Sequence, residues 1–336
     1  MSKLRIEKSQ NRSGKLRGQR IIPHLREDEY QIIPVDLDGD APKQFIRAYF
    51  YEPNVFKAKP KTWKRFIAKT AEKWYPHESV VEYIVNQLGE VLGLRMNRTR
   101  LVVVNQQIRF LSEYFLDRKT QIMIHGAEIC GQYLEDDDFA HEVANDKQSA
   151  RELFTFEFIS EAIRAVFPTE GEQLLVKLIR MIVFDAIVGN NDRHFYNWAV
   201  IVPVKKGTSR PYFAPLYDSA RGLLWNWSDD NLVRQYNLRK QGGRKVEKYI
   251  QKAAPRISIE GNSAINHFDL VKHIWVQHPQ HRETIRKLLS LAQQRKVLKT
   301  YHDRFDRLFI TERNQLVDFV IRTRFATLRE ITQTDV

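Results

Sequence analysis

Short segments rich in apolar, β-branched and aromatic residues dominate the first third of the chain. Three of them cover residues 30–35, 44–51 and 62–70, and Gly, Pro and Asn residues separate them. Two more follow over residues 100–105 and 107–113. Segments of this length and composition, bounded by turn-forming residues, are typical of β-strands. The pattern therefore predicts an antiparallel sheet.

A helical pattern interrupts these strands once and then dominates the rest of the chain. Within residues 78–93, Val81, Ile84, Leu88 and Leu92 fall on one stripe, which is the spacing of an amphipathic helix. Beyond residue 115 most apolar residues recur at helical spacing. We therefore predict an α+β fold with two lobes. The N-lobe is an antiparallel sheet plus one helix, and the larger C-lobe is mainly helical.

The start of the chain has a different composition. Residues 1–20 contain seven lysines and arginines and few apolar residues that could anchor them. Such termini are more often solvated than bound to phosphate or to a membrane surface. We predict a mobile basic tail over residues 1–25, an N-lobe over residues 26–115 and a C-lobe over residues 116–336.

A dense polar cluster follows the apolar helix predicted over residues 173–188, where Gly189 suits a helix end. Asp192 and Asn197 stand there with four residues between them, and a predicted hairpin returns the chain to Asp218. A carboxylate can take the proton of an attacking hydroxyl, and carboxylate and amide oxygens suit Mg²⁺. The spacing predicts a phosphoryl-transfer site. A polar turn that caps a buried helix is the alternative.

Lys69 is the second candidate for this chemistry. Alternation along Phe66, Ala68 and Thr70 turns these residues to one face of the strand and Lys69 to the other. In the helix that follows, Glu82 lies beside the apolar stripe, where a glutamate can pair with that lysine. Glu78, one turn earlier, is the second choice. A lysine and a glutamate that both face solvent would be the simpler interpretation.

The polar cluster resembles the signature of the HipA-like serine/threonine kinases. The resemblance rests on Gly-Asn-Asn-Asp-Arg-His-Phe-Tyr-Asn at residues 189–197 and on Ala-Pro-Leu-Tyr-Asp-Ser at residues 214–219. It implies a two-lobed protein-kinase-like fold with ATP in the cleft. It also implies Asp192 as the catalytic base, and Asn197 and Asp218 as ligands of Mg²⁺.

The same resemblance assigns the nucleotide contacts. Gly39 and Lys43 match the family's phosphate loop, although a plain hairpin turn explains them equally well. The family pairs a strand lysine on the phosphates with a helix glutamate, which Lys69 and Glu82 match. Glu113 and Phe115 stand where the family's hinge holds adenine, with a simple strand-to-loop transition as the alternative.

One feature departs from the family. Several relatives carry an autophosphorylated serine close to the phosphate loop, but no serine occurs between Ser13 and Ser79. Inhibition by phosphorylation of that loop is therefore not expected in this chain.

The resemblance implies a kinase that phosphorylates a Ser/Thr hydroxyl of a protein, acting as a toxin or effector. Two alternatives stay open: a phosphatidylinositol or small-molecule kinase, and a nucleotide-binding pseudoenzyme that serves as a scaffold. The net charge of +13 favours acidic partners, such as an acidic or RNA-bound substrate protein. The resemblance to the family also implies a cognate antitoxin as a partner.

Other sequence features bear on the kinds of site present and on the location of the protein. We find no motif of specific DNA binding, no His/Cys spacing of a zinc site and no apolar run that could span a membrane. With a single cysteine, Cys130, no internal disulfide can form. We predict a cytoplasmic protein, with secretion as an effector still open. The basic segment over residues 234–256 is predicted to be a loop, either solvated or facing the substrate.

Overall fold

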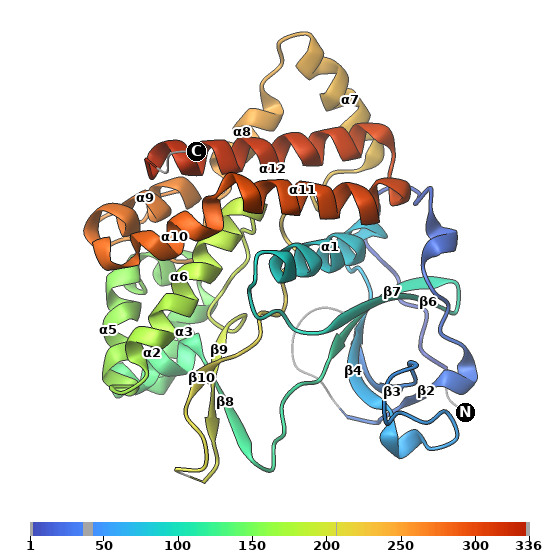
Figure 1. Ribbon diagram of the computed structural model, residues 1–336, viewed down its shortest axis with the longest axis horizontal. Coiled ribbons are helices and arrows are strands. Elements are labelled where there is room, and N and C mark those ends of the chain that lie inside the picture. Colours follow the sequence, from blue (N-terminus) through green and yellow to red (C-terminus); the bar gives the residue numbers. More distant parts are fainter. Residues whose placement is uncertain (1–2, 36–42, 206, 334–336) are drawn as a thin grey trace.

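The computed structural model describes residues 3–35, 43–205 and 207–333 (Figure 1). The predicted phosphate loop around Gly39 lies outside the described residues, apart from Lys43 at its end. The N-lobe sheet lies on one side of the molecule and the helices of the C-lobe on the other, with helix α1 between them (Figure 1). This arrangement confirms the predicted α+β fold with two lobes.

The N-lobe sheet has five strands in the order β2-β3-β4-β7-β6, and all neighbours are antiparallel. The five predicted strands are thereby confirmed. Their bounds are β2 Tyr30–Ile32, β3 Lys43–Ala48, β4 Lys64–Lys69, β6 Thr99–Val104 and β7 Gln107–Glu113.

Helix α1, His77–Val91, covers one face of this sheet. Its buried side chains include Val80 and Ile84, which join a core that also holds Leu101 and Ile108 of the sheet. The other face of the sheet packs a second apolar cluster around Phe66. Because Phe66 and Ala68 face this second cluster, the alternating side chain of Lys69 lies on the α1 side.

The prediction of a mobile N-terminal tail is wrong for the described residues. Strand β1, Asn11–Arg12, pairs in parallel with β5, Trp74–Tyr75. Leu4 is only 2% exposed and belongs to the cluster around Phe66. The backbone N–H of Arg17 donates to the carbonyl of Leu308 in the C-lobe. A few apolar side chains and backbone hydrogen bonds therefore hold this segment, despite its charge.

The C-lobe is mainly helical, as predicted, and it also contains a three-stranded antiparallel sheet in the order β10-β9-β8. The predicted hairpin is β9 and β10, whereas β8 was not predicted. The strands are β8 Gln121–His125, β9 Ala199–Pro203 and β10 Tyr212–Phe213. The helices are α2 Gly126–Leu134, α3 Asp137–Asn145, α4 Lys147–Leu153, α5 Phe156–Val166, α6 Gly171–Val188, α7 Asp229–Lys240, α8 Lys245–Lys252, α9 His267–Gln277, α10 Arg282–Leu289, α11 Leu291–Phe305 and α12 Thr311–Ile331.

Short 3₁₀ helices complete the described chain. They are η1 Gln19–Ile21, η2 Glu27–Glu29, η3 Pro60–Thr62, η4 Pro279–His281 and η5 Asp306–Leu308. Among the described residues, no helix is both long and apolar enough to cross a membrane.

Helix α6 runs through the centre of the C-lobe and carries the polar cluster at its end. It is buried along almost its whole length, with Leu175, Ile179 and Val183 fully enclosed. Gly189 ends it with φ 70°, a left-handed conformation that glycine adopts without steric cost. The chain therefore leaves the core abruptly and enters the segment from Asn190 to Asn197.

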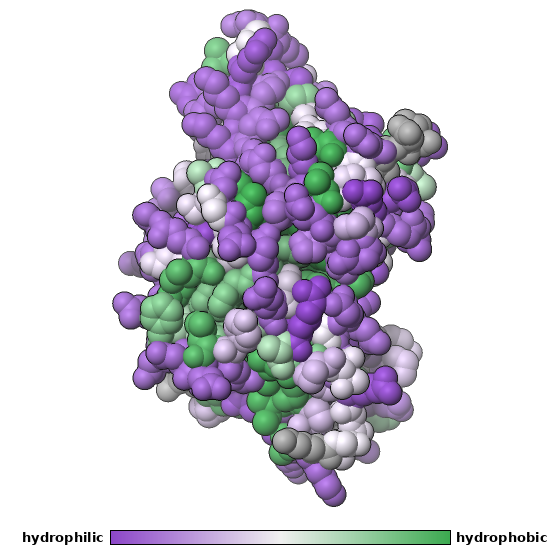
Figure 2. Space-filling model, turned by 90° about the vertical axis from the view of Figure 1, so that its left-hand side faces the viewer, coloured by the Kyte–Doolittle hydropathy of each residue, from purple (hydrophilic) through white to green (hydrophobic). Residues whose placement is uncertain are grey.

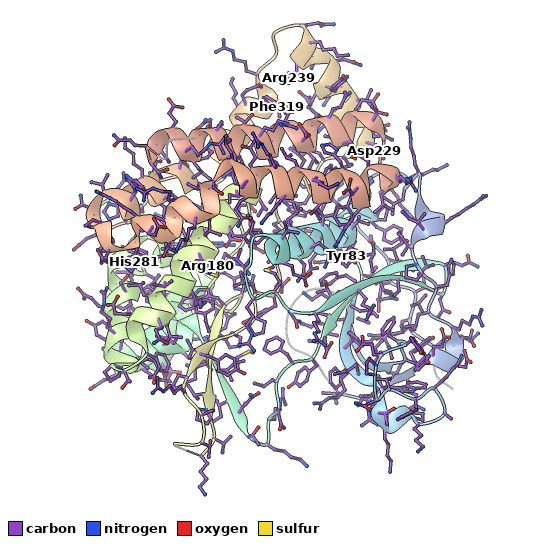
Figure 3. The ribbon with its side chains drawn as sticks, in the orientation of Figure 1. Tyr83, Arg180, Asp229, Arg239, His281 and Phe319 are labelled. Atoms are coloured by element: carbon purple, nitrogen blue, oxygen red, sulfur yellow. The ribbon has the colours of Figure 1, made fainter. Side chains whose placement is uncertain are left out.

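The basic segment over residues 234–256 is not the loop that the sequence predicted. Much of it forms α7 and α8. The Arg239 guanidinium of α7 lies 3.5 Å from the ring centre of Phe319 on α12 (Figure 3). Arg239 also pairs with Glu247 on α8. The surface at the top of the molecule, where these helices lie, is mainly hydrophilic (Figure 2). This region is therefore a packed helical pair with a basic outer face.

Candidate active site

Three charged side chains meet between the lobes, two of them close in sequence and the third, Asp218, from a distant part of the chain. The ammonium of Lys69, at the end of β4, donates to Asp218 Oδ1 at 2.9 Å and to Glu82 Oε1 of α1 at 3.3 Å. The side chains of Lys69 and Glu82 are nearly enclosed, whereas that of Asp218 is 45% exposed. The structure thus forms the predicted pair of Lys69 with Glu82 and adds Asp218 to it.

The surroundings shift the pKa values of these groups in different directions. Burial raises the pKa of Glu82 to about 7, although Lys69 partly opposes the shift. Burial alone would lower the pKa of Lys69, but the carboxylates of Asp218 and Glu82 outweigh it and raise that pKa. For Asp218, burial is outweighed by the charge of Lys69, so its pKa is lowered. Lys69 and Asp218 are therefore held in their charged forms at neutral pH.

Asp218 is positioned by the small C-lobe sheet and by the loop after α1. Two residues before it, Leu216 donates its N–H to the carbonyl of Arg95, and the N–H of Asn97 donates to Leu216. Asp218 itself has φ 53°. This left-handed conformation is uncommon for a residue other than glycine, and such strain is frequent at functional sites.

The predicted catalytic loop is a compact turn. The side-chain amide of Asn197 donates to the carbonyl of Asp192 at 2.8 Å, and the N–H of His194 donates to the same carbonyl. Asn197 is buried. Because its nitrogen makes this bond, the orientation of the amide is fixed, and its oxygen is the atom with which an asparagine binds a metal.

Arg193 connects this loop to the segment that carries Asp218, and sequence analysis missed its role. Its guanidinium pairs with both oxygens of Asp185 on α6, at 2.9 and 3.1 Å. It also donates to the carbonyls of Asn197 and Tyr217, at 3.0 and 2.6 Å. A buried arginine thus fixes the two predicted metal ligands relative to α6. The signal in the sequence was Asp185, an acid within the apolar second half of α6, where a buried carboxylate needs a partner.

Two more arginines that sequence analysis missed contact Asp192. Guanidinium nitrogens of Arg221 and Arg256 each lie 3.1 Å from Asp192 Oδ1. The side chains of Asp192, Arg221 and Arg256 are 16%, 30% and 20% exposed, so the group is accessible from outside. The structure places a carboxylate beside two cations, all three partly exposed.

Glu113 and Phe115, the two residues predicted to contact adenine, have different surroundings in the structure. Glu113, the last residue of β7, uses its N–H for the carbonyl of Arg98, and its own carbonyl accepts from the side chain of Asn97. Phe115 has left the sheet and packs near Tyr217, with 6.1 Å between ring centres. Since the backbone of Glu113 is already bonded to protein, Phe115 is the better candidate for adenine.

Lys43 begins β3 directly opposite Lys69 on β4. Cross-strand partners share a face of a sheet, so both lysines lie on the side toward α1. This is the position in which both can attract phosphate groups. Gly39 lies outside the described residues.

The donor set agrees with a nucleotide and Mg²⁺. Asn197 and Asp218 offer amide and carboxylate oxygens, which are the hard ligands that Mg²⁺ takes together with phosphate oxygens. Lys69 adds a buried positive charge beside them. Charged and polar groups of the required kinds are therefore present, and they come from both lobes.

Comparison with known proteins places this site in context. A model of the HipA-like C-terminal domain family matches residues 35–295, a stretch that contains every residue of the predicted site. Among curated protein sequences, none matches the chain.

Two solved structures are similar over most of the chain. The Helicobacter pylori proinflammatory kinase CtkA has a TM-score of 0.68 and 14% identity, and the match covers 94% of this chain and 100% of that one. HipA of Shewanella oneidensis MR-1, in a complex with HipB and operator DNA, has a TM-score of 0.52 and 11% identity, covering 91% of this chain and 70% of that one. At these identities the likeness shows the fold, and it confirms the predicted kinase-like architecture.

Proposed function

The chain belongs to the HipA-like C-terminal domain family, and from this we propose that it is a kinase that transfers the γ-phosphoryl group of ATP to a Ser/Thr hydroxyl of a protein. The observation that carries the proposal is the contact of Lys69 with both Glu82 and Asp218. It joins the N-lobe sheet, α1 and the metal-binding segment in one charged group. In protein kinases a strand lysine pairs with a helix glutamate and an aspartate holds the metal, and groups of these three kinds meet here.

In the proposed mechanism each residue has one task. Lys69 would contact the phosphates of ATP, and Asn197 and Asp218 would hold Mg²⁺. Mg²⁺, when bound, would offset negative charge on the phosphate oxygens. Asp192 would orient the acceptor hydroxyl and take its proton as the new oxygen–phosphorus bond forms, the bond to the β-phosphate oxygen breaks and ADP leaves.

The arginines beside Asp192 favour an acidic acceptor. Arg221 and Arg256 place two positive charges on one carboxylate oxygen, so an anionic group next to the acceptor hydroxyl can bind them and release Asp192 for proton transfer. Arginines pair well with carboxylate and phosphate groups because their donors form a planar fork. We therefore propose a substrate with acidic or phosphorylated residues near the target serine or threonine.

The proposal extends to biological context by analogy alone. The Shewanella neighbour belongs to a toxin–antitoxin system and is described with HipB and operator DNA. We propose a toxin-like role for this kinase and a partner protein of the antitoxin kind, supported by family membership rather than by a feature of the site.

The test is transfer of labelled γ-phosphate from Mg-ATP by wild type and by Asp192→Asn, with a protein extract and a lipid mixture as acceptors. The variant should bind ATP normally and transfer about 10²–10⁴ times more slowly, because it lacks the base. Asp138→Asn, at an exposed position of α3, is the matched control and should behave as wild type. Equal transfer by Asp192→Asn would remove Asp192 from its role. If label appears on lipid alone, the acceptor is a lipid and the proposal of a protein acceptor is wrong.

A further inference from the structure

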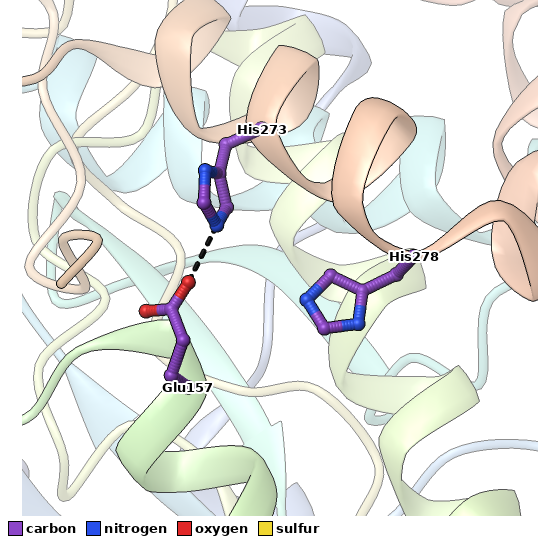
Figure 4. A group of neighbouring side chains, drawn as sticks. All are labelled: Glu157, His273 and His278. Atoms are coloured by element: carbon purple, nitrogen blue, oxygen red, sulfur yellow. Dashed lines mark hydrogen bonds and ion pairs between the residues drawn. The ribbon is translucent and has the colours of Figure 1, made fainter.

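Three side chains of the kinds that ligate metals lie close together in the C-lobe, and none of them belongs to the proposed active site. They are Glu157 in the first turn of α5, His273 on α9 and His278 just after α9 (Figure 4). One ligand atom from each of the three lies within 4.8 Å of the others. In the described part of the chain, no other group of three or more His, Cys, Asp or Glu residues meets this condition.

The carboxylate of Glu157 is held in place from two sides. Its Oε1 lies 2.5 Å from His273 Nε2, and its Oε2 accepts the backbone N–H of Glu260 at 3.0 Å. Both side chains of the Glu157–His273 pair are 23% exposed, so solvent can reach the group although it is mostly covered. A fixed carboxylate next to two imidazoles is a partly preformed ligand set.

His278 is also restrained by its neighbours. Its ring packs edge-on against Phe156, with 5.1 Å between centres, and lies 6.3 Å from the ring of His273. Burial lowers its pKa, which favours the neutral imidazole that a metal requires. The two histidines come from one helix end and the glutamate from another helix, as Figure 4 shows.

His302 provides an informative contrast within the same lobe. It also meets two carboxylates, but its Nδ1 pairs with Asp306 at 3.0 Å and its Nε2 with Asp318 at 2.8 Å. These acids lie at opposite edges of one ring, and they raise the pKa of His302 against the effect of burial. That arrangement suits a charged histidine between two acids and cannot surround one ion.

We propose that Glu157, His273 and His278 bind a divalent transition-metal ion, Zn²⁺ first of all, with water in the remaining position. Two imidazole nitrogens and a carboxylate oxygen are common Zn²⁺ ligands, whereas Mg²⁺ prefers a set made of oxygens. The absence of a thiolate ligand in the group disfavours copper(I). The group shares no residue with the proposed active site.

The bound ion would fasten α5 to the end of α9. Because Glu157 also holds Glu260, four residues after Arg256, the ion would restrain the segment that brings Arg256 to Asp192. An ion that binds only the folded chain stabilises it by mass action. We expect the melting temperature of metal-free protein to rise by about 2–4 °C with saturating Zn²⁺.

The experiment is a calorimetric titration of metal-free protein with Zn²⁺ in excess Mg²⁺, which keeps Zn²⁺ from the proposed active site. Wild type should bind one ion per chain, and His273→Ala and His278→Ala should each weaken binding by about tenfold or more, as loss of a ligand should cost at least as much as loss of an outer-shell partner. His302→Ala is the matched control and should bind as wild type.

Two outcomes would overturn the proposal: no binding by wild type, or equal binding by wild type and both histidine variants. If an alanine variant does not fold without metal, Glu157→Gln replaces it, because the amide oxygen can still accept the N–H of Glu260. This variant should show the same loss of Zn²⁺ affinity with the fold intact. Unchanged affinity in folded Glu157→Gln would remove Glu157 from the site.

Discussion

The two sides of the proposed active site carry opposite imbalances of charge. On the nucleotide side, Lys69 faces two carboxylates, Glu82 and Asp218. On the acceptor side, one carboxylate, Asp192, faces two arginines. Negative charge is in excess around Lys69 when Glu82 is ionised, and positive charge is in excess around Asp192. This difference agrees with the proposed roles, a metal ion beside Asp218 and an acidic substrate beside the two arginines.

The largest effect is expected when one negative charge is removed from the nucleotide side. Asp218→Asn keeps the size of the side chain but deletes a charge that pairs with Lys69 and would bind Mg²⁺. We expect kcat to fall about 10³-fold, because electrostatic stabilisation of the transferred group is usually the largest catalytic contribution. Steady-state kinetics at several Mg²⁺ concentrations measures it.

Higher Mg²⁺ should restore part of the activity of Asp218→Asn, whereas higher acceptor concentration should not. Full activity at ordinary Mg²⁺ would show that Asp218 is not a metal ligand. Asp230→Asn, at an exposed position on α7, is the control for loss of one negative charge elsewhere.

A smaller effect is expected from the acceptor side. Arg256→Ala should raise KM for an acidic or phosphorylated peptide by about tenfold, with kcat for a neutral peptide nearly unchanged, because it removes a charge-assisted contact with substrate. Arg221→Ala should act in the same direction. The comparison needs paired peptides that differ only in acidic residues around one serine.

Arg234→Ala removes the same charge from an exposed face of α7, so it separates a local contact from the overall charge of the protein. If Arg256→Ala and Arg234→Ala change KM equally, the acidic specificity of this site is refuted. If neither changes it, the arginines serve only to orient Asp192.

The smallest expected effect concerns the pH dependence of stability. The folded-state pKa of Glu82 is about 7, above the usual value for a glutamate in an unfolded chain. Protonation of Glu82 therefore stabilises the folded protein. This contribution is fully present below about pH 4.3 and is lost as the pH rises through 7.

Glu82→Gln cannot titrate, so it isolates this contribution. The free energy of unfolding of wild type minus that of the variant should fall by on the order of 1–3 kcal/mol between pH 4.5 and pH 8. Denaturant unfolding at a series of pH values measures it. A difference that stays constant across this range would show that the pKa of Glu82 is not raised.

Local sequence was sufficient for the sheet and the main helices because their patterns are local. The five strands of the N-lobe are short, β-branched segments between turn residues, and α6 ends where Gly189 predicts. The helices α7 and α8 were missed because their polar sequences have few apolar positions. They are held instead by contacts such as that of Arg239 with Phe319.

Parts of the site that depend on long-range contacts could not be predicted. Arg256 reaches Asp192 from 64 residues further along the chain, and nothing in its local sequence marks it among the other basic residues. The same holds for Leu4, whose burial depends on the distant strands that surround it. By contrast, Lys69 and Glu82 are close in sequence. The alternation of the strand and the apolar stripe of the helix show which way each side chain faces, so their contact could be predicted.

The position of α1 has a consequence for how such an enzyme is switched. In many protein kinases the lysine–glutamate pair is a control point because its helix can move. Here α1 also packs on α11, where Tyr83 meets Phe305 edge-on and Gln87 accepts from Arg304 at 2.7 Å. To swing this helix outward, the protein would have to open part of its larger lobe. An inhibitory signal is therefore expected to block the entry of nucleotide or substrate rather than to displace α1.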